Sequence, residues 1–325
     1  MRRREFLGLL ACCALAPVRG QAQQALPVIG FLSARSPADS EHLLKSFREA
    51  LRESGYVEGQ NVAIEYRWGE GHYDRLSAMA VELANRPVTL FVSVGGEPAA
   101  SAAKAATSSI PIVFAIGSDP VKFGFAQSYN RPGGNMTGIN ILTATLETKR
   151  LGLLHELVPQ AQTLGFLLNL AFAPAGSQLA DAQSAAAAIG FEVRVLRASN
   201  DRELDLAFEG FARQPVGALA VAADPFFDTR REKLVSLAAR HAVPTAYHFR
   251  EYVRSGWLMS YGIDPLDAYR QVGVYAGRVL QGGKPAELPL LQPTKFQFVI
   301  NLKTARTLGL DVPPGLSARA DEVIE

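Results

Sequence analysis

Cysteine is almost absent from this sequence, and what there is stands at one end. The 325 residues include two cysteines, Cys12 and Cys13, both within a segment that we expect to be removed from the mature chain. The remainder then offers no disulfide, no thiol nucleophile and no thiolate metal site. The five histidines are scattered, and none stands in the H-E-x-x-H spacing of a zinc site. We therefore expect neither a metal nor a cofactor.

A dominant charge and a long apolar run are also missing. Lys and Arg number 33 against 31 Asp and Glu, so the chain has no electrostatic footprint of a nucleic-acid partner. No stretch after the first residues approaches 18 uninterrupted apolar residues, so we expect no membrane-spanning helix. Hydrophobic residues make up 48% of the chain, which is enough for one large domain or two of medium size.

The common catalytic motifs are missing as well. The chain has no G-x-S-x-G nucleophile elbow. Gly95–Gly96 stands between a strand-like and a helix-like segment, but it lacks both the G-K-[ST] ending of a phosphate loop and the G-x-G-x-x-G of a dinucleotide loop. Carboxylates are plentiful, although their pairing cannot be inferred from the sequence. These absences favour a protein that is not an enzyme.

The first residues have the layout of an export signal. "MRRREFLGLLACCALAPVRGQAQQA" runs from arginines through an apolar stretch to small residues, and Arg3–Leu7 is similar to the twin-arginine pattern R-R-x-F-L. We expect a signal peptide over residues 1–22, cleaved near Ala22, and a periplasmic product. A general secretory signal and a lipid anchor at Cys12 or Cys13 are the alternatives. Removing the leader's net +3 from the whole chain's +2 leaves the mature protein at −1.

The remaining residues alternate strand-like and helix-like segments, and the alternation occurs twice. Residues 27–34, 61–68, 88–94 and 111–117 read as strands separated by helices, and residues 163–170 open a second series. Gly165 follows Gly30 by 135 residues, and Gly190 follows Gly55 by the same interval. This pattern predicts two α/β lobes with parallel sheets covered on both faces. Ligands of such sheets bind at the loops after the strands, so two facing lobes would enclose a cleft.

The tail departs from this alternation. Residues 257–261 and 296–300 read as strands, and a long helix is predicted over 265–281 between them. We interpret these segments as further passes between the lobes, which gives about three hinge crossings. Lobe one is expected over residues 23–140 plus about 263–292. Lobe two is expected over 141–262 plus about 293–325.

Several runs resemble one family throughout the mature chain. They are "SDPVKFGFAQSYNRPGGNMTGIN", "ETKRLGLLHELVPQ", "GWLMSYG", "GKPAELPLLQPTKFQFVINLKTARTLGL" and "RADEVIE". The chain resembles the periplasmic substrate-binding proteins of ABC transporters, in the tryptophan/tyrosine-uptake-like branch of the type I binding-protein fold. Trp257 departs from the pattern, where glycine is expected, and would add bulk near the base of the cleft or a hinge.

The resemblance implies a receptor without catalysis that delivers a small solute to an ABC permease in the inner membrane. An amino acid or an aromatic acid is the ligand it favours, and we expect a monomer that closes about a hinge. A periplasmic module that senses a ligand for a membrane signalling receptor is an alternative, and a periplasmic enzyme is a weaker one. A ligand-responsive transcription regulator would need a DNA-binding helix pair where the export leader stands.

The predicted cleft loops supply the candidate ligand-binding residues. Most have a structural alternative: a tight turn at Gly95–Gly96, and a cap or turn at Ser118–Asp119 and at Asp224. For the aromatic residues the alternatives are core packing of Phe226, packing of Trp68 on its own helix, and burial of Tyr261 between the lobes at a hinge. Glu97 and the two aspartates can meet an ammonium group, and Ser118 can donate to a carboxylate. Tyr261 can stack on a ligand or hydrogen-bond to it. The full set is Ser33, Trp68, Gly95, Gly96, Glu97, Ser118, Asp119, Asn140, Asp224, Phe226, Tyr261 and Gly262.

Overall fold

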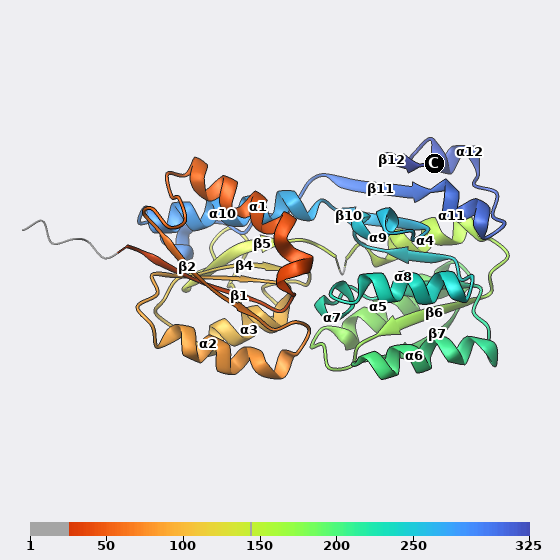
Figure 1. The fold of residues 1–325 in the computed structure, drawn as a ribbon, viewed down its shortest axis with the longest axis horizontal. Helices are drawn as coiled ribbons and strands as arrows, with labels where there is room; N and C mark the ends of the chain where they lie inside the picture. Colours follow the sequence, from red (N-terminus) through yellow and green to blue (C-terminus); the bar gives the residue numbers. More distant parts are fainter. Residues whose placement is uncertain (1–25, 144) are drawn as a thin grey trace, which may run out of the picture.

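Two lobes lie side by side along the long axis of the molecule (Figure 1). In the computed structural model, the described residues are 26–143 and 145–325. The leader predicted over residues 1–22, with its arginine pair and both cysteines, lies outside them. The predicted fold class, two α/β lobes built on parallel sheets, is confirmed, with one antiparallel strand that the sequence analysis did not predict.

Lobe one is built on a five-stranded parallel sheet in the order β2-β1-β3-β4-β5. Its strands are β1 Val28–Ser33, β2 Ala63–Trp68, β3 Leu90–Val94, β4 Ile112–Ile116 and β5 Met136–Asn140. The three central strands β1, β3 and β4 consist almost entirely of buried residues, as expected for a sheet that is covered on both faces.

Helices cover both faces of this sheet. They are α1 Pro37–Glu53, α2 Leu76–Ala84, α3 Glu97–Ala106 and α10 Pro265–Leu280, with the short 3₁₀ helices Tyr73–Arg75 and Pro285–Glu287. Successive residues of a strand point to opposite faces, so Phe31 joins the core under α1 and α10, whereas Leu32 joins the core over α2 and α3. The two cores hold the helices on the sheet, and each fully buried aliphatic side chain contributes about 1.5–3 kcal/mol.

Lobe two is built on a seven-stranded sheet in the order β12-β11-β10-β9-β8-β6-β7. Its strands are β6 Thr163–Leu168, β7 Glu192–Arg197, β8 Ala218–Val221, β9 Thr245–Tyr247, β10 Met259–Ile263, β11 Phe296–Asn301 and β12 Glu322–Ile324. Strand β11 is the antiparallel exception and pairs with β10. Its direction is reversed because the chain enters it from lobe one, after α10.

The helices of lobe two pack on this sheet and on one another. They are α4 Glu147–Leu157, α5 Ala175–Ala188, α6 Asp201–Glu209, α7 Pro225–Asp228, α8 Arg231–Arg240, α9 Arg250–Arg254, α11 Leu302–Thr307 and α12 Pro314–Ser317, with the 3₁₀ helix Gly210–Ala212. Helix α4 contacts α5, and α8 contacts α6 and α9. Within the described residues, no helix is both long enough and apolar enough to span a bilayer.

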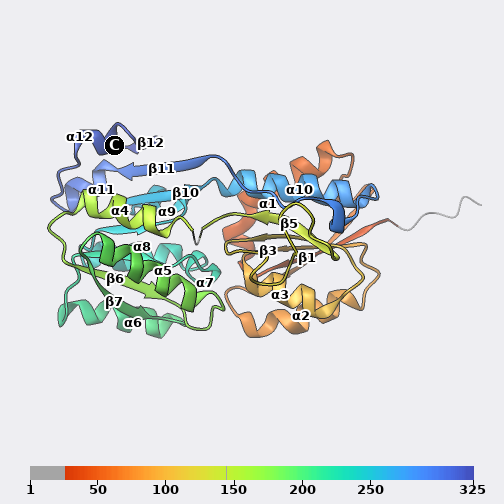
Figure 2. The same ribbon diagram turned by 180° about the vertical axis from the view of Figure 1, so that it is seen from behind.

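The chain passes from one lobe to the other between β5 and α4, between β10 and α10, and between α10 and β11, as both views show (Figures 1 and 2). The last of these crossings begins after Leu291, which still pairs with Ile139 of lobe one. Helix α10 follows β10 of lobe two but packs on α1 of lobe one. Strand β5 was not predicted as an element, because its residues Met136–Asn140 follow a turn-rich segment that was interpreted as an approach to the hinge.

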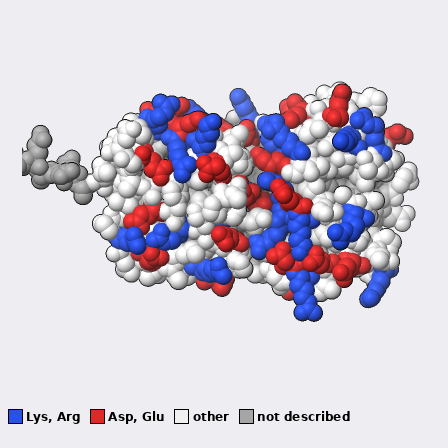
Figure 3. Space-filling view, viewed as in Figure 1, with Lys and Arg blue, Asp and Glu red and all other residues white. Residues whose placement is uncertain are grey.

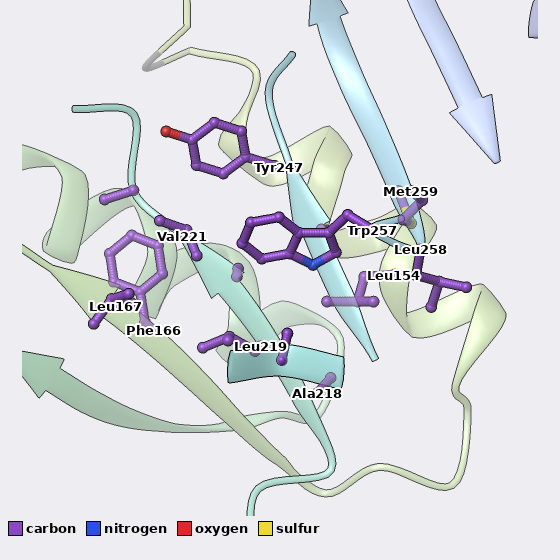
Figure 4. Packing of buried hydrophobic residues seen from close by; sticks show 14 of the residues in the cluster. Leu154, Phe166, Leu167, Ala218, Leu219, Val221, Tyr247, Trp257, Leu258 and Met259 are labelled. Carbon is purple, nitrogen blue, oxygen red and sulfur yellow. The ribbon is translucent and has the colours of Figure 1, made fainter. Parts of the chain in front are cut away.

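Trp257 lies in the core of lobe two, where it is 2% exposed, and does not line the space between the lobes. Its ring stacks on Tyr247 at a centroid distance of 5.6 Å and also contacts Tyr252. Figure 4 shows it among Leu154, Leu219 and Leu258. The expectation that Trp257 adds bulk at the cleft or a hinge is therefore replaced: its bulk fills the inside of one lobe.

Trp257→Phe should lower the free energy of unfolding by about 1–2 kcal/mol, because a smaller ring leaves a cavity that the rigid core fills only in part. Urea unfolding at constant temperature measures the change, with an unchanged denaturant slope. Leu170→Ala is the control, since Leu170 is 55% exposed and its truncation leaves no cavity. Equal stability of Trp257→Phe and the unmodified protein would contradict this packing.

Candidate functional site

A narrow cavity of about 50 Å³ lies where the two lobes meet, at the loops that follow the carboxyl ends of their strands. Both lobes and the crossing segments line it. The lining residues are Arg35, Gly95, Gly96, Glu97, Ala115, Gly117, Ser118, Ile141, Thr143, Phe172, Gln178, Ala223, Asp224, Pro225, Asp228, His248, Phe249, Ile263, Pro265, Ala268 and Tyr269.

On the lobe-one side, the carboxylate of Glu97 folds back onto its own lobe. It accepts hydrogen bonds from the backbone N–H groups of Gly117 at 3.1 Å and Ser118 at 2.6 Å. Glu97 is 2% exposed, and burial raises its pKa although these donors oppose the rise. Gly95 and Gly96 have φ of 76° and 90°, which an L side chain rarely adopts, so both glycines are required by this turn.

On the lobe-two side, Asp224 is both a helix cap and a cavity residue. Its Oδ1 accepts from the backbone N–H of Phe226 at 2.6 Å, which caps α7, and from the hydroxyl of Tyr73 in lobe one. Its Oδ2 is buried and makes no hydrogen bond among the described residues, although the nearby side chain of Asn169 favours the charged form of the carboxyl and opposes the rise of its pKa. Burial raises the pKa of Asp224 to about 7, and the nearby charge of Asp228 adds to the rise.

A buried ion-pair network joins the lobes beside the cavity. Arg35, which follows β1, contacts Asp228 of lobe two at 2.5 Å and Asp39 of its own lobe at 2.6 Å. Arg231 of lobe two contacts Asp39 at 3.3 Å. Burial opposes the charge of Arg35, but the two carboxylates outweigh it and hold its pKa above the ordinary value. Burial likewise raises the pKa of Asp228, and Arg35 opposes that rise.

Apolar and aromatic groups form the rest of the wall. Phe172, Phe249 and Tyr269 supply rings, and Ile141 and Ile263 supply aliphatic surface. His248 is 2% exposed, and burial together with the charges of Arg150 and Arg35 lowers its pKa well below 6.5, so this imidazole is neutral at neutral pH. The cavity therefore combines an apolar wall with a few buried polar groups, which is the usual make-up of a small-molecule site.

Charged side chains also lie along the outer junction of the lobes (Figure 3). Arg230 of lobe two donates to the backbone oxygen of Glu70 in lobe one at 3.1 Å. No group of three or more His, Cys, Asp or Glu side chains within residues 26–143 and 145–325 has the arrangement of a metal site.

Five of the predicted site residues line the cavity: Gly95, Gly96, Glu97, Ser118 and Asp224. The other seven lie elsewhere in the described residues. Phe226 and Gly262 are neighbours in the chain of the lining residues Pro225 and Ile263. The ring of Phe226 packs in the lobe-two core, and a Cβ at Gly262 would overlap the carbonyl oxygen of His248.

Another four predicted residues have hydrogen-bond or ring partners within their own lobe. Ser33 accepts from the backbone N–H of Arg35, so it supports a cavity residue without lining the cavity. Asn140 is bonded to Tyr129 and to the backbone of residue 142. The ring of Tyr261 stacks on Phe296. Asp119 accepts from the backbone of residue 121 at the surface.

Trp68 is the last of the seven. Its ring stacks on Tyr66 at 6.1 Å and packs against the lobe-one core beside Phe31, so its aromatic neighbours lie on the strands of its own lobe and not on a helix. The sequence analysis did not single out several residues that the fold brings to the cavity or its edge. They are Arg35, Tyr73, Gln178, Asp228, His248 and Tyr269.

The sequence matches one protein family and a characterised relative. A family model described as "ABC transporter substrate binding protein" matches residues 29–324. A tyrosine-binding protein of Clostridioides difficile is 26% identical over 270 residues, which are 82% of this chain and 76% of that protein.

Solved structures show the same arrangement. An ABC domain from Streptococcus pneumoniae in complex with L-Trp has a TM-score of 0.83 and 25% identity, covering 92% of this chain and 100% of that one. A conserved domain protein from Vibrio cholerae has a TM-score of 0.85 and 23% identity, with the same coverage of both chains, and shares the fold.

Proposed function

This chain belongs to the family of ABC transporter substrate-binding proteins, as the motifs of its sequence predicted, and we propose that it captures a small solute between its lobes and delivers it to an ABC permease in the inner membrane. The observation that carries the proposal is the cavity, which both lobes line and whose wall includes Asp224, a residue with one buried carboxylate oxygen that has no partner in the described chain. We further propose export to the periplasm and cleavage near Ala22.

An amino acid with an apolar body suits this cavity better than an aromatic acid. The unpartnered Oδ2 of Asp224 can accept from an ammonium group, whereas an acid without an amine would bring a second negative charge to it. Phe172, Phe249 and Tyr269 offer the surface for the body of the ligand. The tyrosine-binding and L-Trp-bound relatives make L-tyrosine and L-tryptophan the first solutes to test.

Ligand entry requires the lobes to separate. Ligand pockets usually enclose roughly 300–1,000 Å³, and the cavity of about 50 Å³ has room for a few water molecules. We propose that the structure has the closed arrangement, that the crossings between the lobes act as a hinge, and that the solute docks on one lobe before the other closes.

Tyr73→Phe should weaken solute binding about 3–10-fold, because the closed form loses a hydrogen bond between the lobes while Asp224 keeps its bond from the N–H of Phe226. Calorimetry with L-tryptophan measures the change. Tyr56→Phe is the control, since it removes a hydroxyl from a ring that packs against the lobe-one core. An unchanged affinity for Tyr73→Phe would show that this bond does not favour closure.

A thermal-shift screen tests the proposed function directly, because a solute that binds the native state raises the melting temperature. L-Tryptophan, L-tyrosine, their amine and acid counterparts, and aliphatic amino acids form the panel. Small-angle scattering of the protein should show compaction when the solute with the largest shift is added. If no solute of these classes raises the melting temperature, the proposed ligand class is wrong, and if a tight solute causes no compaction, hinge closure is wrong.

A further inference from the structure

The backbone donors at the mouth of lobe one are already occupied by a carboxylate of the protein itself. Glu97 accepts from the N–H groups of Gly117 and Ser118, which follow β4. The next residue of α3 is Pro98, which has no N–H. Glu97 thus stands where the carboxylate of a bound amino acid would otherwise find hydrogen-bond donors at the end of a strand and the start of a helix.

The guanidinium of Arg35 and the backbone N–H of Phe226 also have partners within the protein. The terminal nitrogens of Arg35 contact Asp228 and Asp39, so two carboxylates already oppose one guanidinium. The N–H of Phe226 points to Asp224 and to the Tyr73 oxygen. Arg35 Nε and the Tyr269 hydroxyl have no partner among the described residues, but they lie beside Asp39 and Asp228. A ligand carboxylate placed there would be repelled by both carboxylates.

Two of the open positions on the lobe-two side are acceptors, and a third is the Nδ1 atom of the neutral His248, which has no partner in the described chain. Asp224 Oδ2 and Gln178 Oε1 are both buried without partners in the described chain, and the amide nitrogen of Gln178 is held by the carbonyl oxygen of Ala223, next to Asp224. Together they can accept from an ammonium group that sits against Phe172 and Phe249.

We infer that the amine of the ligand, and not its carboxylate, is what this site recognises, so that a primary amine with an apolar or aromatic body binds at least as tightly as the amino acid with the same body. The inference rests on the proposed function and narrows its ligand class. Three carboxyl groups and one guanidinium line the cavity, and this balance favours a net cation over a zwitterion, and a zwitterion over an anion.

Matched ligands test this on the intact protein. Calorimetry compares tryptamine, L-tryptophan and indole-3-propionate, and the corresponding tyramine and isoamylamine sets. In the set that binds best, the amine should equal or exceed the amino acid, and the acid should be at least tenfold weaker. If the amino acid binds tenfold more tightly than its amine, the inference is overturned while the proposed function stands. Binding by no member of any set would overturn both.

Glu97→Ala tests whether the side chain of Glu97 is the reason that the site does not recognise the carboxylate of the ligand. It frees the N–H groups of Gly117 and Ser118, so the ratio of L-tryptophan affinity to tryptamine affinity should rise about tenfold. Glu97→Gln keeps an oxygen on those donors and removes the charge, so its ratio should rise by less. Because both ligands are measured on the same variant, a general loss of stability cancels in the ratio. Equal ratios in the Glu97→Ala variant and the unmodified protein would overturn the assignment of Glu97 as the internal carboxylate.

Discussion

Asp224→Asn should weaken the binding of tryptamine and of L-tryptophan at least 100-fold. Asparagine can still accept from the N–H of Phe226 and cap α7, so the local backbone should persist. What is lost is the charge beside the ligand amine, and a buried cation left without its counter-ion costs about 3–5 kcal/mol. Calorimetry at pH 8, where the carboxyl of the unmodified protein is ionised, measures the loss.

Asp119→Asn is the matched control for this prediction. Asp119 was also a candidate, it follows a strand of the other lobe, and the substitution is chemically identical. Its Oδ1 accepts from the backbone of residue 121 and it does not line the cavity, so affinity should stay within about twofold. Equal losses in both variants, or no loss in Asp224→Asn, would remove Asp224 from the site.

The candidates that reached the cavity are those whose position follows from the order of the elements. Gly95–Glu97 and Ser118 stand directly after strands β3 and β4, and Asp224 precedes α7, so an alternation of strands and helices is enough to place them at the cleft. The resemblance to substrate-binding proteins added the pairing of the two lobes. At Asp224 the structural alternative describes one carboxylate oxygen, which caps a helix, and the other oxygen is buried without a hydrogen bond among the described residues.

The residues that sequence reasoning missed depend on partners far along the chain. Arg35 and Asp228 are 193 residues apart, and Tyr73 and Asp224 are 151 apart, so neither pair leaves a local spacing that a reader could find. Tyr73 is the first residue of a short 3₁₀ helix of lobe one. Trp68 and Tyr261 were predicted to bind ligand for the same reason. Their rings stack on Tyr66 and Phe296 of their own lobes, and these contacts follow only from the packed fold.

The ionisation of Asp224 sets how binding should respond to pH. Its pKa is raised from 3.8 to about 7 by burial, with Asp228 adding to the rise and Tyr73, Asn169 and the N–H of Phe226 opposing it. In the ligand-free protein the native state therefore keeps a proton that the unfolded chain releases. Between pH 4 and 7 this group lowers the stability of the ligand-free fold as pH rises, by roughly 4 kcal/mol in all.

Ligand affinity should change in the opposite direction. An ammonium ligand needs the ionised carboxylate, so its affinity should rise about 100-fold from pH 5 to pH 8, with a tenfold change per unit below the pKa. His248 stays neutral through this range because its pKa is lowered, whereas Asp228 has a raised pKa and can add to the slope near pH 6. Calorimetry with tryptamine from pH 5 to pH 8 measures it. The Asp224→Asn variant separates the two carboxylates: only a slope that depends on Asp224 disappears in it, and a slope of the same size in that variant would assign the pH response to Asp228.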